Sequence, residues 1–227
     1  MENLRPNAQR AKNAIVLIWI VLALEIVSLI SGYYKYDLLQ TVANGGVVTT
    51  ETATANDTRE QIIGIVYLIA SIISAITFIQ WFRRAYFNLH LKVNHLSHSE
   101  GWAAGSWFVP IISLYRPFQI MKELYQETKK LLTRNGLTLD KNFLTSPLSL
   151  WWTLWIGNNI IGQIFFRYPS ETVEDLIAGT VVAMIGCVTG ILLALITVKV
   201  IKEYANVEPL LNEIKNDEEK TIIQNNV

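Results

Sequence analysis

Three histidines and a glutamate lie close together just beyond a long apolar block, at His90, His95, His98 and Glu100. Imidazole and carboxylate groups are metal ligands, but this spacing matches no zinc pattern and no cysteine accompanies it. The four residues are therefore weak metal candidates, and we expect no bound metal and no other cofactor. A solvated loop, or a loop that faces lipid headgroups, is the simpler interpretation.

A carboxylate interrupts the first long apolar block, at Glu25. Inside a membrane span such a group costs roughly 2.5–3.5 kcal/mol, so it faces the bundle interior or water and has a partner. Asn158 and Asn159 fall at similar depth in another block, and we expect Glu25, in its protonated form, to form a hydrogen bond with one of them. The arrangement is either a structural clasp between helices or part of an ion or proton pathway.

Basic residues and tryptophans gather in the middle of the chain. Arginine binds phosphate bidentately, and tryptophan flanks acyl or headgroup carbons. A lipid or ligand pocket at the inner leaflet would use Arg83, Arg84, Trp102, Trp107, Arg116, Lys122, Trp151 and Trp152. The alternative is ordinary anchoring of the helices by positive charges and an aromatic belt.

Four long apolar blocks would position these residues, at about 14–34, 62–82, 148–166 and 176–198. Each approaches the roughly 20 residues that a helix needs to cross a hydrocarbon core of about 30 Å. The sequence thus predicts an all-α integral membrane protein with four transmembrane helices, a single membrane domain over 1–204 and a polar cytoplasmic tail over 205–227. Close helix packing, within the chain or between copies, is predicted for the fourth block by its small residues Gly179, Ala183, Gly186 and Gly190.

Basic residues sort sharply among the segments that join these blocks. Three precede the first block, nine lie between residues 83 and 141, and four follow residue 198, whereas the other two connections hold three together. Because positive charge marks the cytoplasmic side, both termini and the long central segment are predicted to be cytoplasmic, in a bacterial inner membrane. The outer connection over 35–61 is rich in Thr, Ala, Gly and Asn and is predicted to be a mobile loop.

An apolar stretch, EGWAAGSWFVPIISLYRP, interrupts the basic central segment. As a helix its uncharged part would be only about 21 Å long, and a crossing there would place the following lysines outside. Residues 101–117 are therefore predicted to form a re-entrant or interfacial segment of the inner leaflet. Residues 118–135 have the apolar spacing of an amphipathic helix that ends at Asn135 and Gly136, and this helix either lies on the membrane or packs against another protein helix.

Three motifs in order, WFRRAYFNLHLKV, SEGWAAGSWFVPIISLYRPFQIMKELY and WWTLWIGNNI, span about Trp81 to Asn159. In order and spacing this region resembles a bacterial membrane family known as domain of unknown function 4328. The resemblance implies the membrane architecture and no activity. The positions that match the family pattern are Arg84, Tyr86, Asn88, Gly101, Trp102, Gly105, Trp107, Pro110, Arg116, Pro117, Gln119, Glu123, Trp151, Trp152 and Asn158.

These observations favour a membrane-embedded binding or scaffold module that engages lipid or a cytoplasmic protein partner, with a homo-oligomer as one form. A small oligomeric channel or transporter with Glu25 and Asn158 near the pathway is the alternative. A membrane enzyme that uses the histidine-rich loop is third, and catalysis is unsupported because the sequence has no phosphate loop, nucleophile elbow or paired acid and base. We expect no nucleic-acid partner.

Overall fold

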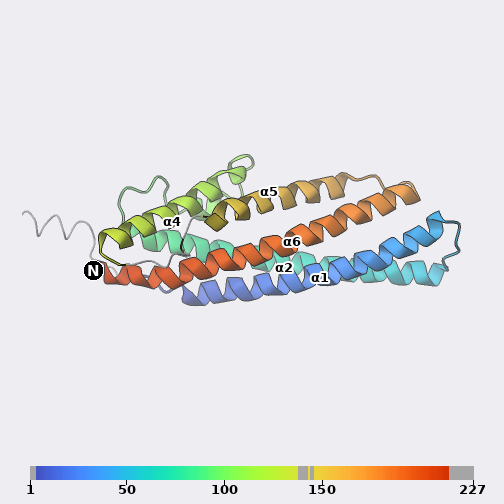
Figure 1. Ribbon diagram of the computed structural model, residues 1–227, viewed down its shortest axis with the longest axis horizontal. Helices are drawn as coiled ribbons and strands as arrows, with labels where there is room; N and C mark the ends of the chain where they lie inside the picture. Colours follow the sequence, from blue (N-terminus) through green and yellow to red (C-terminus); the bar gives the residue numbers. More distant parts are fainter. Residues whose placement is uncertain (1–3, 138–142, 144–145, 215–227) are drawn as a thin grey trace, which may run out of the picture. The chain divides into compact units, whose positions relative to one another are not determined.

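The computed structural model describes residues 4–137, 143 and 146–214. No strand occurs in that part of the chain, so the all-α prediction is confirmed. The elements, in chain order (Figure 1), are α1 (Ala8–Ala43), α2 (Thr50–His90), α3 (Trp102–Gly105), the 3-10 helix η1 (Ile112–Leu114), α4 (Arg116–Arg134), α5 (Ser146–Arg167), α6 (Val173–Val207) and the 3-10 helix η2 (Glu208–Glu213).

The elements form two compact units. Unit 1 comprises Met1–Val16, Ala75–Leu150 and Val198–Val227. Unit 2 comprises Leu17–Ser74 and Trp151–Thr197. Helices α1, α2, α5 and α6 therefore each contribute one part to unit 1 and another part to unit 2.

Three helices of the described chain are long and apolar enough to cross a membrane: α1, α2 and the run of α6 with η2. Helix α5 has 22 residues, which is sufficient length, but it carries Asn158, Asn159 and Gln163 together with three tryptophans. These polar and indole groups interrupt its apolar residues, so that α5 has no stretch as apolar as those of the other three. Three of the four predicted spans thus correspond to such helices, and the span over 148–166 stays a prediction.

The connection between α1 and α2 differs from the prediction. The prediction of a mobile loop over 35–61 was wrong, because α1 continues to Ala43 and α2 begins at Thr50. The Thr49 hydroxyl accepts a hydrogen bond from the Thr52 N–H at 3.2 Å, as a helix N-cap does. Alanine, glutamate and glutamine residues of this tract favour helix, and they outweigh the threonines that resemble a loop composition.

Helices α5 and α6 run side by side in unit 2 (Figure 1). The chain enters α6 through a capping box in which Thr172 and Asp175 exchange two hydrogen bonds of 3.1 Å. A Cβ atom at Gly186 would lie 3.4 Å from the Ile161 side chain of α5. The small-residue stripe of α6 therefore allows close approach within the chain at this point.

Unit 1 has an aromatic core that α2, α4 and α6 build together. The fully buried rings are those of Trp81, Phe82, Tyr86, Tyr125 and Tyr204. Tyr204 lies with its ring centroid 5.5 Å from that of Tyr125 and 6.3 Å from that of Trp81. Aromatic pairs at these distances add to the free energy gained by burying the rings.

Helix α4 is the amphipathic helix that the sequence predicts over 118–135. Its apolar face is buried in unit 1, and the Tyr125 hydroxyl donates a hydrogen bond of 2.6 Å to the Val200 carbonyl of α6. Of the two alternatives, this helix packs against protein of its own chain. It ends in the predicted Asn-Gly stop, where Gly136 has φ 76° and its N–H donates to the Thr133 carbonyl at 3.1 Å.

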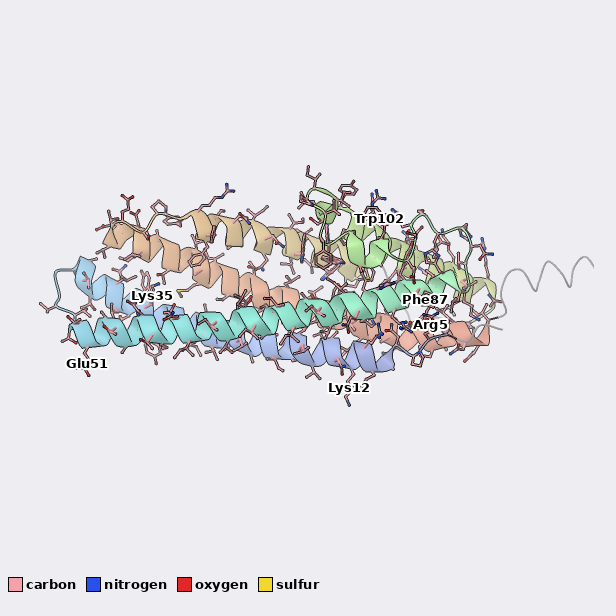
Figure 2. The ribbon with its side chains drawn as sticks, turned by 180° about the vertical axis from the view of Figure 1, so that it is seen from behind. Arg5, Lys12, Lys35, Glu51, Phe87 and Trp102 are labelled. Atoms are coloured by element: carbon pink, nitrogen blue, oxygen red, sulfur yellow. The ribbon has the colours of Figure 1, made fainter. Side chains whose placement is uncertain are left out.

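The segment before α1 and the 3-10 helix η2 both contact α2 in unit 1. The Asn88 amide donates to the Arg5 carbonyl at 2.9 Å and to the Glu208 carboxylate at 2.6 Å. The Asn7 amide donates to the same carboxylate at 2.9 Å. Figure 2 shows Arg5 beside Phe87, with its guanidinium 4.1 Å from the ring centroid.

The start of the C-terminal segment differs from the polar tail that was predicted from residue 205. Leu211 and Ile214 are buried in unit 1, and the Lys92 ammonium donates a hydrogen bond of 2.9 Å to the Ile214 carbonyl. The apolar side chains of η2 explain this packing, because their burial in the core of unit 1 removes apolar surface from water.

Candidate functional site

The Glu123 carboxylate of α4 accepts hydrogen bonds from two other segments of unit 1. The Tyr86 hydroxyl of α2 donates to it at 2.6 Å, and the Ser97 N–H donates to its other oxygen at 2.8 Å. Burial alone would raise the pKa of Glu123, but the hydrogen bonds that its carboxylate accepts lower the pKa below the usual value. Burial raises the pKa of Tyr86, and the bond to Glu123 raises it further, so the phenol stays a neutral donor.

A histidine joins this carboxylate to an arginine. The Nδ1 atom of His98 lies 3.5 Å from a Glu123 oxygen, and its Nε2 contacts Nη1 of Arg116. Because a guanidinium only donates hydrogen bonds, Nε2 of His98 is the acceptor in its contact with Arg116.

Arg116 is held by aromatic rings as well. Its guanidinium carbon lies 5.9 Å from the Trp102 centroid and 5.5 Å from the Tyr115 centroid. Its Nε atom is buried and has no hydrogen-bond partner. One donor of the guanidinium is thus unused, while the rings fix its position.

These groups line a pocket of about 590 Å³ on unit 1. The two acids of the pocket have donors inside the protein: Glu123 as described, and Glu127 from Lys130 at 2.6 Å and from His95 at 3.2 Å. Across the described chain, neither Arg116 nor Lys122 forms an ion pair with a carboxylate. The two cations and the two carboxylates of the wall balance in formal charge, and Lys130 beside Glu127 adds one positive charge. Its walls are formed by Ser97, His98, Arg116, Gln119, Lys122, Glu123, Gln126 and Glu127.

An exposed apolar loop precedes Arg116. A continuous helix does not cover residues 101–117, which instead form α3, a series of turns and η1. The N–H of Ile112 donates to the Pro110 carbonyl at 2.7 Å across Ile111, whose φ is 66°. A three-residue turn with positive φ at a β-branched residue is rare and strained. It leaves the Ile111 side chain 75% exposed, beside exposed Phe108 and Leu114.

The predicted cluster of basic residues and tryptophans does not assemble as one pocket. Arg116 and Lys122 line the pocket, and Trp102 supports Arg116. Arg83 instead pairs with Glu100 at 3.2 Å. The pKa of Arg84 is lowered by burial and by nearby arginines.

The remaining tryptophans of the cluster have structural contacts. Trp107 packs edge-on against Phe78, with the ring centroids 5.7 Å apart. Trp151 and Trp152 belong to unit 2, where the Trp151 N–H donates to the Thr197 hydroxyl at 3.1 Å. The pattern of charges missed Tyr86, Gln119 and Glu123, which the resemblance to the family had marked. It also missed Ser97, Gln126 and Glu127, which the resemblance had not marked.

The histidines are spread over different contacts. His90 packs edge-on against Tyr86 with ring centroids 4.8 Å apart, whereas His95 and His98 face different glutamates. Across residues 4–137, 143 and 146–214, no group of three or more potential ligands is placed to hold a metal ion.

Glu25 lies in a separate pocket within unit 2. The carboxylate is 6% exposed and accepts a hydrogen bond of 2.6 Å from the Tyr67 hydroxyl. The predicted bond to an asparagine is not formed. Asn158 instead accepts from the Thr189 hydroxyl at 3.0 Å, and the Asn159 amide donates to the Trp155 carbonyl at 2.7 Å. The Tyr67 hydroxyl of α2 therefore donates the hydrogen bond to Glu25 that was expected from an asparagine.

Comparison with family models links the sequence of this chain to a family. The family model described as Domain of unknown function (DUF4328) matches residues 44–206, which includes the whole region of the three motifs. No curated protein and no solved structure matches the chain.

Proposed function

The chain belongs to the DUF4328 family, and we propose that it is a membrane-embedded binding module whose unit 1 pocket takes a phosphate-bearing group at the cytoplasmic face. The observation that carries this proposal is that Arg116 and Lys122 lie in the pocket wall without an ion-pair partner in the described chain, beside two acids that already accept hydrogen bonds. Guanidinium and ammonium groups with unused donors bind phosphate oxygens.

The aromatic setting of Arg116 supports the same chemistry. A guanidinium that two rings hold in place loses little side-chain entropy when it binds an anion. The Gln119 amide on the same wall adds donors that can bind further oxygens.

The loop before Arg116 supports a lipid as the source of the phosphate. Strain at Ile111 keeps an isoleucine exposed, and strained residues of this kind persist where they serve a function. In this proposal Phe108, Ile111 and Leu114 enter the inner leaflet, and the pocket then receives a headgroup. This is the interfacial role that the sequence predicts for residues 101–117.

The proposal completes the membrane topology with α5 as a fourth span. The charge distribution of the sequence then keeps both termini and unit 1 on the cytoplasmic side of a bacterial inner membrane. Asn158 would be tolerated in such a span, because its amide oxygen already accepts the Thr189 hydroxyl.

Lipid retention tests the proposal. The protein is reconstituted in nanodiscs of phosphatidylcholine and phosphatidylglycerol, and the lipid that it retains is measured by native mass spectrometry. Retained phosphatidylglycerol should fall by about tenfold in Arg116→Gln and in Lys122→Gln, because a hydrogen bond to a charged group contributes about 1.5–3 kcal/mol. Lys129→Gln is the matched control, an exposed lysine of α4 outside the pocket wall.

A second arm separates lipid from free phosphate. Inorganic phosphate is titrated into the protein in pure phosphatidylcholine nanodiscs, with heat as the readout. Saturable phosphate binding that Arg116→Gln removes, without retained phosphatidylglycerol, would identify a soluble ligand of the same chemistry. Absence of both kinds of binding, or an equal loss in Lys129→Gln, would overturn the proposal.

A further inference from the structure

The Glu25 pocket of unit 2 is a second site, independent of the pocket that holds Arg116. Its volume is about 230 Å³, several times the roughly 30 Å³ that a water molecule occupies in the liquid. Helices α1, α2, α5 and α6 all contribute to its wall. The wall consists of Glu25, Ser28, Tyr67, Asn158, Ile161, Gly162, Phe165, Ala183, Gly186 and Cys187.

An ionised Glu25 would have no counter-ion among the described residues. Glu25 is buried, and no lysine, arginine or histidine of the described chain forms an ion pair with it. The Tyr67 hydroxyl donates one hydrogen bond, which orients the carboxylate without neutralising it. An ionised carboxylate in an apolar span is costly unless a cation joins it.

The backbone of α6 is shaped around this carboxylate. A Cβ atom at Gly190 would lie 2.3 Å from Oε1 of Glu25 and 2.7 Å from its Cδ. An alanine at this position would have to displace the carboxyl group. Gly190 therefore provides space for Glu25, whereas the sequence pattern had assigned it to contact between helices.

The composition of the wall distinguishes among cations. A bare metal ion replaces its hydration shell with about six or more oxygens, and few side-chain oxygens line this pocket. The amide oxygen of Asn158 is already an acceptor for Thr189. By contrast, Tyr67, Ile161 and Phe165 offer aromatic and aliphatic surface, which suits a cation that carries its own apolar groups.

We propose that the unit 2 pocket binds a small organic ammonium ion, with Glu25 as its counter-charge and Tyr67 and Phe165 as aromatic wall. The carboxylate supplies the electrostatic attraction, and Tyr67 holds it in position through the 2.6 Å hydrogen bond. The remaining wall contacts the alkyl groups of the ion.

Titration with tetramethylammonium chloride tests this site. The full chain is placed in phosphatidylcholine nanodiscs, and binding is followed by calorimetry. We expect saturable binding that Glu25→Gln weakens by at least about tenfold, because the variant keeps the shape of the side chain and removes its charge. Sodium chloride at equal concentration should not compete.

Two alanine variants of glycine make the test independent of folding defects in Glu25→Gln. Gly190→Ala retains the carboxylate but displaces it, and it should also weaken binding by about tenfold. Gly157→Ala is the control, because a Cβ atom there meets no atom within 4 Å and the residue does not line the pocket. Each variant is compared at equal helix content by circular dichroism.

The proposal is overturned if tetramethylammonium shows no saturable binding, if Glu25→Gln binds as the wild type does, or if sodium competes at equal concentration. Arg116→Gln should leave the ammonium titration unchanged, which separates this site from the proposed phosphate pocket. A loss of ammonium binding in that variant would contradict the independence of the two sites.

Discussion

Helix α2 takes part in both units and places its apolar side chains in opposite ways. In unit 2 its isoleucines and leucines face outward, and Leu68 is 59% exposed. In unit 1 Trp81, Ala85 and Leu89 of the same helix are fully buried. One helix therefore meets two kinds of surroundings along its length.

This difference shows that the two units gain their stability in different ways. Unit 1 gains free energy by removing apolar surface from water into its own core, as soluble domains do. Unit 2 leaves its apolar surface outside, which is favourable only where lipid surrounds it.

The largest effect on stability is expected from a comparison of two leucines of α2, one in each unit. Leu89→Ala should destabilise the protein by about 2–5 kcal/mol, because it opens a cavity in a closed core. Leu68→Ala should change the free energy of unfolding by no more than about 0.5 kcal/mol. Unfolding in detergent micelles, followed by tryptophan fluorescence, measures both. Equal effects would show that the two units do not differ in packing.

A smaller effect is expected at the polar junction of unit 1. Asn88→Ala removes donors from the Arg5 carbonyl and from the buried Glu208 carboxylate, and should cost about 2–3 kcal/mol. The same substitution at exposed Asn13 is the control, and a few tenths of a kcal/mol is expected there. Limited proteolysis of the C-terminal segment should accelerate in Asn88→Ala alone. An unchanged cleavage rate would mean that Asn88 does not stabilise the packing of Arg5 and Glu208 against α2.

The Glu123 network predicts a dependence on pH. Because folding lowers the pKa of Glu123, its contribution to stability is present above the ordinary value near 4.5 and is lost as the pH falls through the folded pKa. Glu123→Gln should cost about 1–2 kcal/mol at neutral pH, and the gap to the wild type should close in acid. Unfolding curves at a series of pH values measure this gap. A gap that is constant with pH would contradict the network.

The smallest effect concerns an exposed ion pair. The side chains of Arg83 and Glu100 are 55% and 40% exposed, and solvent screens their interaction. Arg83→Ala should therefore change stability by less than about 1 kcal/mol and should not alter lipid retention. A loss of retained phosphatidylglycerol comparable to that in Arg116→Gln would place Arg83 in the binding site after all.

Much of the fold follows from local sequence patterns. The uncharged blocks correctly identify α1, α2 and α6 as helices able to span a membrane, and the spacing in 118–135 identifies α4. The stop at Asn135 and Gly136 was predictable because a left-handed residue after a helix favours glycine. These features depend on neighbours along the chain, which a sequence displays.

The sites depend on how helices rotate against one another, and this the sequence does not display. Tyr67 looks like one more apolar residue of a span, yet its hydroxyl binds Glu25. Tyr86 and Ser97 meet Glu123 only after α4 has folded against α2. Net charge along the chain likewise could not tell Arg116, which lines a pocket, from Arg83, which pairs at the surface.

Labelling of single cysteines tests most directly the claim that unit 1 lies in the cytoplasm while unit 2 lies in lipid. In a Cys187→Ala background, Asn44→Cys and Ser170→Cys report on two exposed connections, and Lys129→Cys reports on the exposed face of α4. A membrane-impermeant maleimide should label positions 44 and 170 in right-side-out vesicles, and position 129 only after permeabilisation. Labelling of position 129 in intact vesicles, or of position 170 only after permeabilisation, would contradict the account.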